Sequence, residues 1–121
     1  MRIWHEELIP DLCQKHLCAM WRESLGCYKI ITENKKGYRN HPAVKEFIGF
    51  ANILWIRLGM VRKEMINRGY NPKLMPSTPD LSLCGTFEAY KRGQWQTLEE
   101  QKQILRDKGC KCKLYGKKKD V

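Results

Sequence analysis

The chain has 121 residues, 42% of them hydrophobic, and its 23 basic and 13 acidic side chains give a formal net charge of +10. We expect one domain, residues 1–121, because a chain of this length buries a core without needing a disulfide or a metal. Such a basic excess favours a polyanionic partner, most often nucleic acid, since lysine and arginine displace counterions from phosphates. The alternative is a soluble protein with a high pI and no such partner.

Two features argue against secretion and membrane insertion. Glu6, Glu7 and Asp11 interrupt the N-terminal region, which therefore lacks the pattern of a secretory signal. The most apolar stretch, residues 47–60, contains Arg57 and is too short to cross a bilayer. We therefore expect a cytoplasmic monomer, associated with the nucleoid if the source is prokaryotic, with no membrane partner.

The first predicted helix covers residues 10–32. Pro10 suits a first helical turn, where its missing N–H costs nothing. Apolar residues then recur at roughly helical spacing, at positions 12, 17, 20, 21, 25, 28 and 31. The polar residues 34–37 end the pattern.

A second helical region is predicted from Pro42 to about Arg68. Gly69 suits the position after a helix end, and Pro72 prevents the helix from resuming. The apolar residues between them are dense enough for a central, mostly buried helix. Gly49 is a candidate break inside this region.

The last third of the chain combines a loop, a helix and a basic tail. Residues 71–96 hold scattered prolines and glycines without a period, which predicts a long irregular loop. Thr97 and Glu100 match a capping box for a third helix, residues 98–108. The tail begins at about residue 110. The sequence thus predicts an all-α fold, a single compact domain of about three helices with a long irregular loop before the third.

Four tryptophans and six cysteines remain to be placed. We expect the tryptophans mainly in the core, with Trp95 the most exposed of them. The cysteines form no CxxC pair, so in a reducing compartment we expect free thiols. Cys84, Cys110 and Cys112 could ligate zinc together with a histidine, but the C-x-C spacing lacks the usual gap of two to four residues. We therefore expect no metal.

The first predicted helix carries an acid–base–cation set. His16 and Glu23 are seven residues apart and project from nearly the same face, with Arg22 about 100° around the helix from Glu23. A carboxylate can shuttle protons for a neighbouring amine, and an imidazole with a guanidinium suits phosphate or sugar contacts. The alternative is an ordinary solvated helix face.

The α-amine at residue 1 is a candidate partner for this set. The initiator methionine is removed only before a small residue, and Arg2 is large, so we expect Met1 to stay with a free amine. An α-amine titrates near pH 8, against about 10.4 for lysine. It is therefore the more available nucleophile at neutral pH, and amines form Schiff bases with carbonyl carbons.

The chain opens with Met-Arg-Ile-Trp and carries Gln-Lys-His-Leu at residues 14–17 and Trp-Arg-Glu at residues 21–23. These segments resemble the pyrimidine-dimer DNA glycosylase (endonuclease V) family, whose phage members have a similar Arg-Ile opening and a Gln-His-Leu then Tyr-Arg-Glu pattern. The segments at residues 37–42 and 68–70 look more like cellular members. The resemblance covers most of residues 1–72.

The resemblance implies a DNA glycosylase with AP-lyase activity on pyrimidine dimers or related damage in double-stranded DNA. In that family the N-terminal amine attacks C1′ of the damaged nucleotide and forms an imine, so neither a metal nor an organic cofactor is needed. Met1 would supply the amine and Glu23 the catalytic carboxylate. The matching DNA contacts would be Arg2, His16, Arg22, Arg39, His41 and Lys117. For His41, a capping turn is the alternative role.

Two departures from the phage pattern stand out. The phage enzyme exposes a threonine amine after methionine removal, whereas this chain would use Met1 itself. A further phage arginine on the same helix face is matched here by Gly26. Two other classes stay open at this point: a noncatalytic helical nucleic-acid-binding module, and a helical interaction protein that does not bind DNA.

Overall fold

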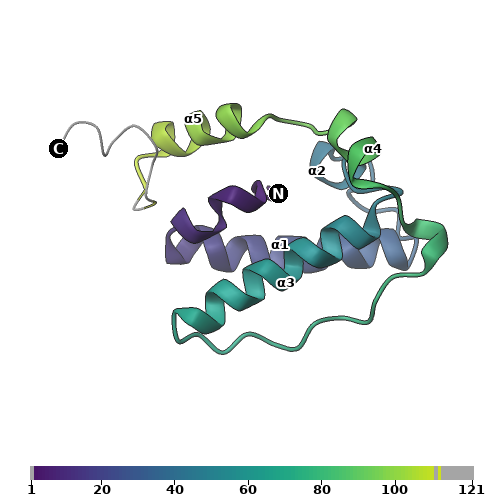
Figure 1. The fold of residues 1–121 in the computed structure, drawn as a ribbon, viewed down its shortest axis with the longest axis horizontal. Helices are drawn as coiled ribbons and strands as arrows, with labels where there is room; N and C mark the ends of the chain where they lie inside the picture. Colours follow the sequence, from purple (N-terminus) through teal and green to yellow (C-terminus); the bar gives the residue numbers. More distant parts are fainter. Residues whose placement is uncertain (1, 111, 113–121) are drawn as a thin grey trace.

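The computed structural model describes residues 2–110 and 112, and within them it contains helices and no strand, which confirms the predicted all-α class (Figure 1). Two long helices pack against each other at the centre of the fold, and shorter elements surround them. In chain order the elements are η1 (Glu6–Asp11, a 3₁₀-helix), α1 (Gln14–Thr32), α2 (Pro42–Lys45), α3 (Ala51–Asn67), η2 (Leu81–Leu83, a 3₁₀-helix), α4 (Phe87–Arg92) and α5 (Leu98–Lys108).

The core lies between α1 and α3. Each buried aliphatic side chain there contributes roughly 1.5–3 kcal/mol through its removal from water. The fully buried residues of the two helices include Leu17, Met20, Leu54, Leu58 and Val61. Ile3 and Trp4 join the same core, so the start of the chain is fixed against the long helices. Among the described residues, no helix is long and apolar enough to cross a membrane.

The first helix begins four residues later than predicted. Pro10 lies inside η1, which the His5 imidazole caps by accepting a hydrogen bond from the Glu7 N–H at 3.1 Å. Leu12 is extended after η1, and α1 starts at Gln14. The prediction at Pro10 was wrong because this proline is near the end of η1 and not in the first turn of α1, and apolar spacing alone did not separate the two helices.

The second predicted helical region is divided in two, and Gly49 confirms the expected break. Its φ of +85° lies in the left-handed region, which glycine enters without a Cβ penalty. The chain therefore leaves the short α2 and re-enters helix as α3, whose end at Asn67 is followed by Gly69 at φ +86°. The predicted helix stop at Gly69 is confirmed.

The segment between α3 and α5 is irregular for most of its length, but it also contains η2 and α4. The Thr86 hydroxyl caps α4 by accepting from the Ala89 N–H at 3.2 Å, a signal that the sequence reading missed. Side chains of the long helices hold the rest in place. Trp55 Nε1 donates to the Pro76 carbonyl at 2.9 Å, and Tyr28 Oη donates to the Ser77 carbonyl at 2.6 Å.

The capping box of α5 is present as predicted. The Glu100 N–H donates to the Thr97 hydroxyl at 3.1 Å, and the Thr97 N–H donates to the Glu100 carboxylate at 3.0 Å. The helix ends at Lys108, and Gly109 adopts the left-handed conformation. Trp95, just before this helix, is 38% exposed, whereas Trp4 is 3% exposed, in line with the placement expected for the tryptophans.

Candidate active site

The start of the chain lies over the middle of α1. The Arg2 backbone N–H donates to Oε2 of Glu23 at 2.9 Å, although the two residues are 21 positions apart. The neighbouring Ile3 and Trp4 are buried in the core, and the His5 N–H donates to Gln101 of α5 at 2.6 Å. These contacts fix the N-terminal segment beside one carboxylate.

A cavity of about 270 Å³ opens next to this carboxylate. It combines an acid, two cationic side chains, an imidazole and an indole from three parts of the chain: the N-terminal segment, α1 and α5. Its lining residues are Arg2, Trp4, His16, Ala19, Glu23 and Lys108. The arrangement can hold an anionic or sugar-like group while a carboxylate accepts or returns a proton.

The Arg2 side chain is clamped between two indole rings. Its guanidinium carbon lies 5.1 Å from the centre of the Trp4 ring and 4.9 Å from that of Trp95. The guanidinium also donates to Oε1 of Gln96. Burial lowers the pKa of Arg2 while the negative charge of Glu23 opposes that shift. The stacked guanidinium is thus held in one place as a fixed positive group.

His16 closes the other side of the cavity. Its ring meets the Trp4 ring edge-on, with centroids 5.8 Å apart. Its Nδ1 lies 3.3 Å from Cys13 Sγ and 3.2 Å from Cys112 Sγ. Burial lowers the pKa of His16, and the charges of Lys108 and Lys15 lower it further, while Glu23 raises it. A histidine pKa below its usual value means that the ring is neutral at pH 7, so it acts as a hydrogen-bonding group rather than a charge.

Most of the other residues proposed for DNA contact lie outside the cavity. Arg22 is exposed on α1 beside Glu23. Arg39 lies near the far end of α1, where its guanidinium donates to the Ile30 carbonyl at 3.4 Å. About 20 Å of helix axis separates that point from His16. The structure therefore does not bring Arg39 to the cavity. Met1 and Lys117 lie outside the described residues.

His41 has two roles in the structure. It caps α2, because its Nδ1 accepts from the Ala43 N–H at 3.1 Å, as the capping alternative predicted. Its ring also meets Trp95 edge-on with centroids 5.9 Å apart. Since Trp95 stacks on Arg2, His41 is connected to the cavity through one aromatic ring.

The sequence reading missed Gln96 and Lys108 as site residues. Both come from the last third of the chain: Lys108 lines the cavity, and Gln96 accepts a hydrogen bond from the Arg2 side chain. Lys108 carried one local signal, a cation in the last turn of a helix, but that position is common for any lysine. The sequence predicted that Trp95 would be the most exposed tryptophan. In the structure its partly exposed ring stacks on the Arg2 guanidinium.

The structure and the sequence together define a class of protein: a small all-α protein that holds a carboxylate and a stacked guanidinium beside the start of its described chain. A family model described as pyrimidine dimer DNA glycosylase matches residues 1–76, and the chain belongs to that family. The matched range contains Glu23, His16 and Arg2 but ends before α4 and α5. No curated protein and no solved structure gives a significant match.

Gly26 stands where phage members of the family have an arginine, so restoring that arginine tests whether this face of α1 contacts DNA. A Cβ built at Gly26 meets no atom within 4 Å, so a longer side chain fits there, one turn from Arg22 and Glu23. We predict that Gly26→Arg strengthens duplex binding and steepens the salt dependence by about one counterion. Loss of a mid-helix glycine should also add about 1 kcal/mol of stability.

Fluorescence anisotropy across a salt series measures the first effect, and thermal unfolding measures the second. Gly26→Ala is the matched control, because it gives the same helix gain without a charge. If the arginine variant binds no more tightly than the alanine variant, this face of α1 does not contact DNA phosphates.

Proposed function

We propose that the protein is a DNA glycosylase with AP-lyase activity on pyrimidine dimers or related damage, and that the N-terminal α-amine is its nucleophile. Glu23 would assist that amine. Arg2, His16 and Arg22 would contact the DNA backbone or sugar, and His41, Arg39 and Lys117 would extend that contact. The observation that carries the proposal is the 2.9 Å hydrogen bond from the Arg2 N–H to Glu23.

This hydrogen bond supports the proposal because it joins Glu23 to the backbone nitrogen that follows the proposed nucleophile in the chain. In any peptide, the nitrogen of one residue lies within about 4 Å of the nitrogen of the next. We therefore propose that Glu23 serves an amine one residue before Arg2. A general base or acid has to be that close to the group that it serves.

The chemistry that we propose proceeds in balanced steps. The amine nitrogen bonds to C1′, the glycosidic bond breaks, and the damaged base leaves with the bonding electron pair and takes up a proton. Opening of the sugar ring gives a protonated imine. Loss of a C2′ proton then expels the 3′ phosphate by β-elimination, and water releases the amine. Glu23 is suited to carry protons in these steps because it faces the start of the chain.

The positive groups around the cavity would bind the distorted duplex. Extruding a nucleotide costs a few kcal/mol, least where pairing is already damaged. Phosphate contacts can offset that cost. The described cations around Glu23 include Arg2 and Lys108, which line the same cavity, and the exposed Arg22, its neighbour in the sequence. We therefore expect affinity to fall steeply as salt is raised.

The direct test uses a duplex with a single pyrimidine dimer and an identical undamaged duplex. We expect strand cleavage only at the dimer, and borohydride should trap a covalent protein–DNA complex by reducing the imine. An abasic duplex should be trapped as well. If the protein binds duplex DNA with strong salt dependence but neither cleaves nor becomes trapped, it is a noncatalytic binding module and the proposed activity is wrong.

A further inference from the structure

Four potential metal ligands meet where the end of α5 approaches the beginning of α1. Cys13 is the cap of α1, His16 is in its first turn, and Cys110 and Cys112 follow α5. One ligand atom from each residue lies within 4.8 Å of all the others. Of the three residues that the sequence suggested for zinc, Cys84 is therefore not in the cluster, and Cys13 and His16 complete it.

We propose that these four side chains bind one zinc ion in a structural Cys₃His site. Zinc–sulfur bonds of about 2.3 Å and zinc–nitrogen bonds of about 2.0 Å place tetrahedral ligand atoms roughly 3.5–3.8 Å apart. In the structure His16 Nδ1 is 3.3 Å from Cys13 Sγ and 3.2 Å from Cys112 Sγ. Small side-chain rotations therefore convert the cluster to zinc geometry.

The chemistry of the donor set favours zinc over harder ions. Three thiolates and one imidazole are soft or borderline ligands, whereas magnesium and calcium prefer oxygen. The Cys112 sulfur accepts a hydrogen bond from the Cys13 backbone N–H at 3.0 Å, the type of outer contact that supports a metal-bound thiolate. Lys15 and Lys108 line the same cavity as three of the ligands, and their positive charges would offset the net negative charge of a zinc ion with three thiolates.

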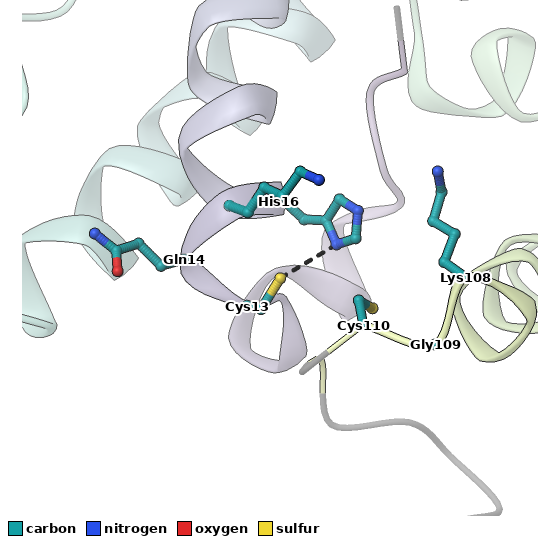
Figure 2. A pocket seen from close by; sticks show the side chains of 7 residues that line it. Cys13, Gln14, His16, Lys108, Gly109 and Cys110 are labelled. Atoms are coloured by element: carbon teal, nitrogen blue, oxygen red, sulfur yellow. Dashed lines mark hydrogen bonds between the residues drawn. The ribbon is translucent and has the colours of Figure 1, made fainter.

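The site is also accessible from solvent. A cavity of about 610 Å³ borders three of the four ligands and is open on one side, so a zinc ion has a path of entry. Figure 2 shows the side chains that line this cavity, with Cys13, His16 and Cys110 near one another and Lys108 beside them. The dashed line marks the contact between Cys13 and the near nitrogen of His16.

A zinc ion at this site would connect the part of the chain that the family model matches with the part beyond the match. Cys13 and His16 are inside the matched residues 1–76, and Cys110 and Cys112 are outside them. The ion would thus fasten α5 to the beginning of α1. It would also hold Lys108 and His16 at the smaller cavity that contains Glu23.

Coordination through Nδ1 would fix the tautomer of His16. The Nδ1 atom faces Cys13 and Cys112, so a metal there leaves Nε2 as the protonated nitrogen. His16 would then offer a permanent N–H donor to the neighbouring cavity. In that arrangement the histidine serves both the zinc site and the nucleic-acid surface, through its two different nitrogens.

The test measures metal directly in the full chain, purified under reducing conditions without chelators and without a histidine tag. We expect one zinc ion per chain by mass spectrometry of the elements. Cobalt should replace zinc and give the visible bands of a tetrahedral site together with a sulfur-to-cobalt charge-transfer band. Chelation should lower the melting temperature, and added zinc should restore it.

Cys110→Ser and Cys112→Ser should each lose at least about a hundred-fold in zinc affinity, since removal of a ligand costs more than the 10–100-fold of an outer-shell change. Cys18→Ser and Cys84→Ser are the matched controls, because neither residue belongs to the cluster, and both should keep full zinc content.

Four results would overturn the proposal. They are a wild-type chain that binds neither zinc nor cobalt, a chain that contains iron instead, a disulfide among the four residues without metal, and equal zinc content in the Cys110 and Cys18 variants. The wild-type measurements decide the matter even if a ligand variant fails to fold. They also do not depend on DNA repair activity, so a failure of the proposed function leaves this proposal standing.

Discussion

Glu23→Gln is expected to reduce dimer cleavage and borohydride trapping by about a hundred-fold to ten-thousand-fold, the usual contribution of a general acid or base. The substitution is nearly isosteric. A glutamine amide oxygen can still accept the hydrogen bond that the Arg2 N–H now gives to Oε2 at 2.9 Å. The N-terminal segment should therefore stay where it is, while the group that carries protons is removed.

Duplex binding should change little in this variant, because a carboxylate repels phosphates rather than attracting them. The measurement pairs single-turnover cleavage with binding by fluorescence anisotropy at the same salt concentration. Glu33→Gln is the matched control, because Glu33 follows the same helix, is exposed, and pairs with Lys35 at 3.6 Å away from the cavity. A Glu23 variant with wild-type cleavage would remove the carboxylate from the mechanism.

Most of the helices could be predicted from the sequence, because residues close together in the chain determine where a helix begins and ends. The capping box at Thr97 and the glycine stop at Gly69 are interactions within a few residues of the chain. The start of α1 was misplaced because Pro10 fits a 3₁₀ turn as well as an α turn. The short α4 was not predicted, because a threonine cap that no regular apolar pattern follows is also common in loops.

The same distinction between local and distant interactions decides which site residues could be predicted from the sequence. Glu23, His16 and Arg22 share one helix, so their juxtaposition followed from helical geometry. Gln96 and Lys108 are far from the N-terminal segment in the sequence. The periodicity of a single helix cannot predict a contact between such distant residues. The cluster of Cys13 and His16 with Cys110 and Cys112 is of the same kind, since only the folded chain brings the two pairs together.

An extension of one or more residues before Met1 is expected to remove covalent trapping of abasic DNA almost completely while leaving the fold intact. An added residue turns the α-amine into an amide nitrogen, whose lone pair is delocalised and does not attack carbon. The measurement is the rate of borohydride trapping with abasic duplex.

Two matched proteins separate the amine from the bulk of the extension. One carries the same added residues after Val121, and it should trap DNA at the normal rate. The other is a fusion whose protease leaves Met1 as the first residue, and cleavage should restore trapping. Deletion of residues 117–121, by contrast, should weaken binding modestly and in a salt-dependent way, because it removes the positive charges of three lysines.

Normal trapping by an N-terminally extended protein would identify a lysine as the nucleophile. Lys15, on the first helix, and Lys45, close to His41 in the sequence, are two candidates, and Lys108 is a third. Lys108 lines the cavity that contains Glu23, whereas Lys15 lines the neighbouring cavity at the cysteine cluster and Lys45 is at the end of α2. Lys108→Gln in the extended protein would then be the decisive variant. A lysine ammonium titrates at about 10.4, so a lysine nucleophile would also shift the optimum for trapping to higher pH than an α-amine near 8.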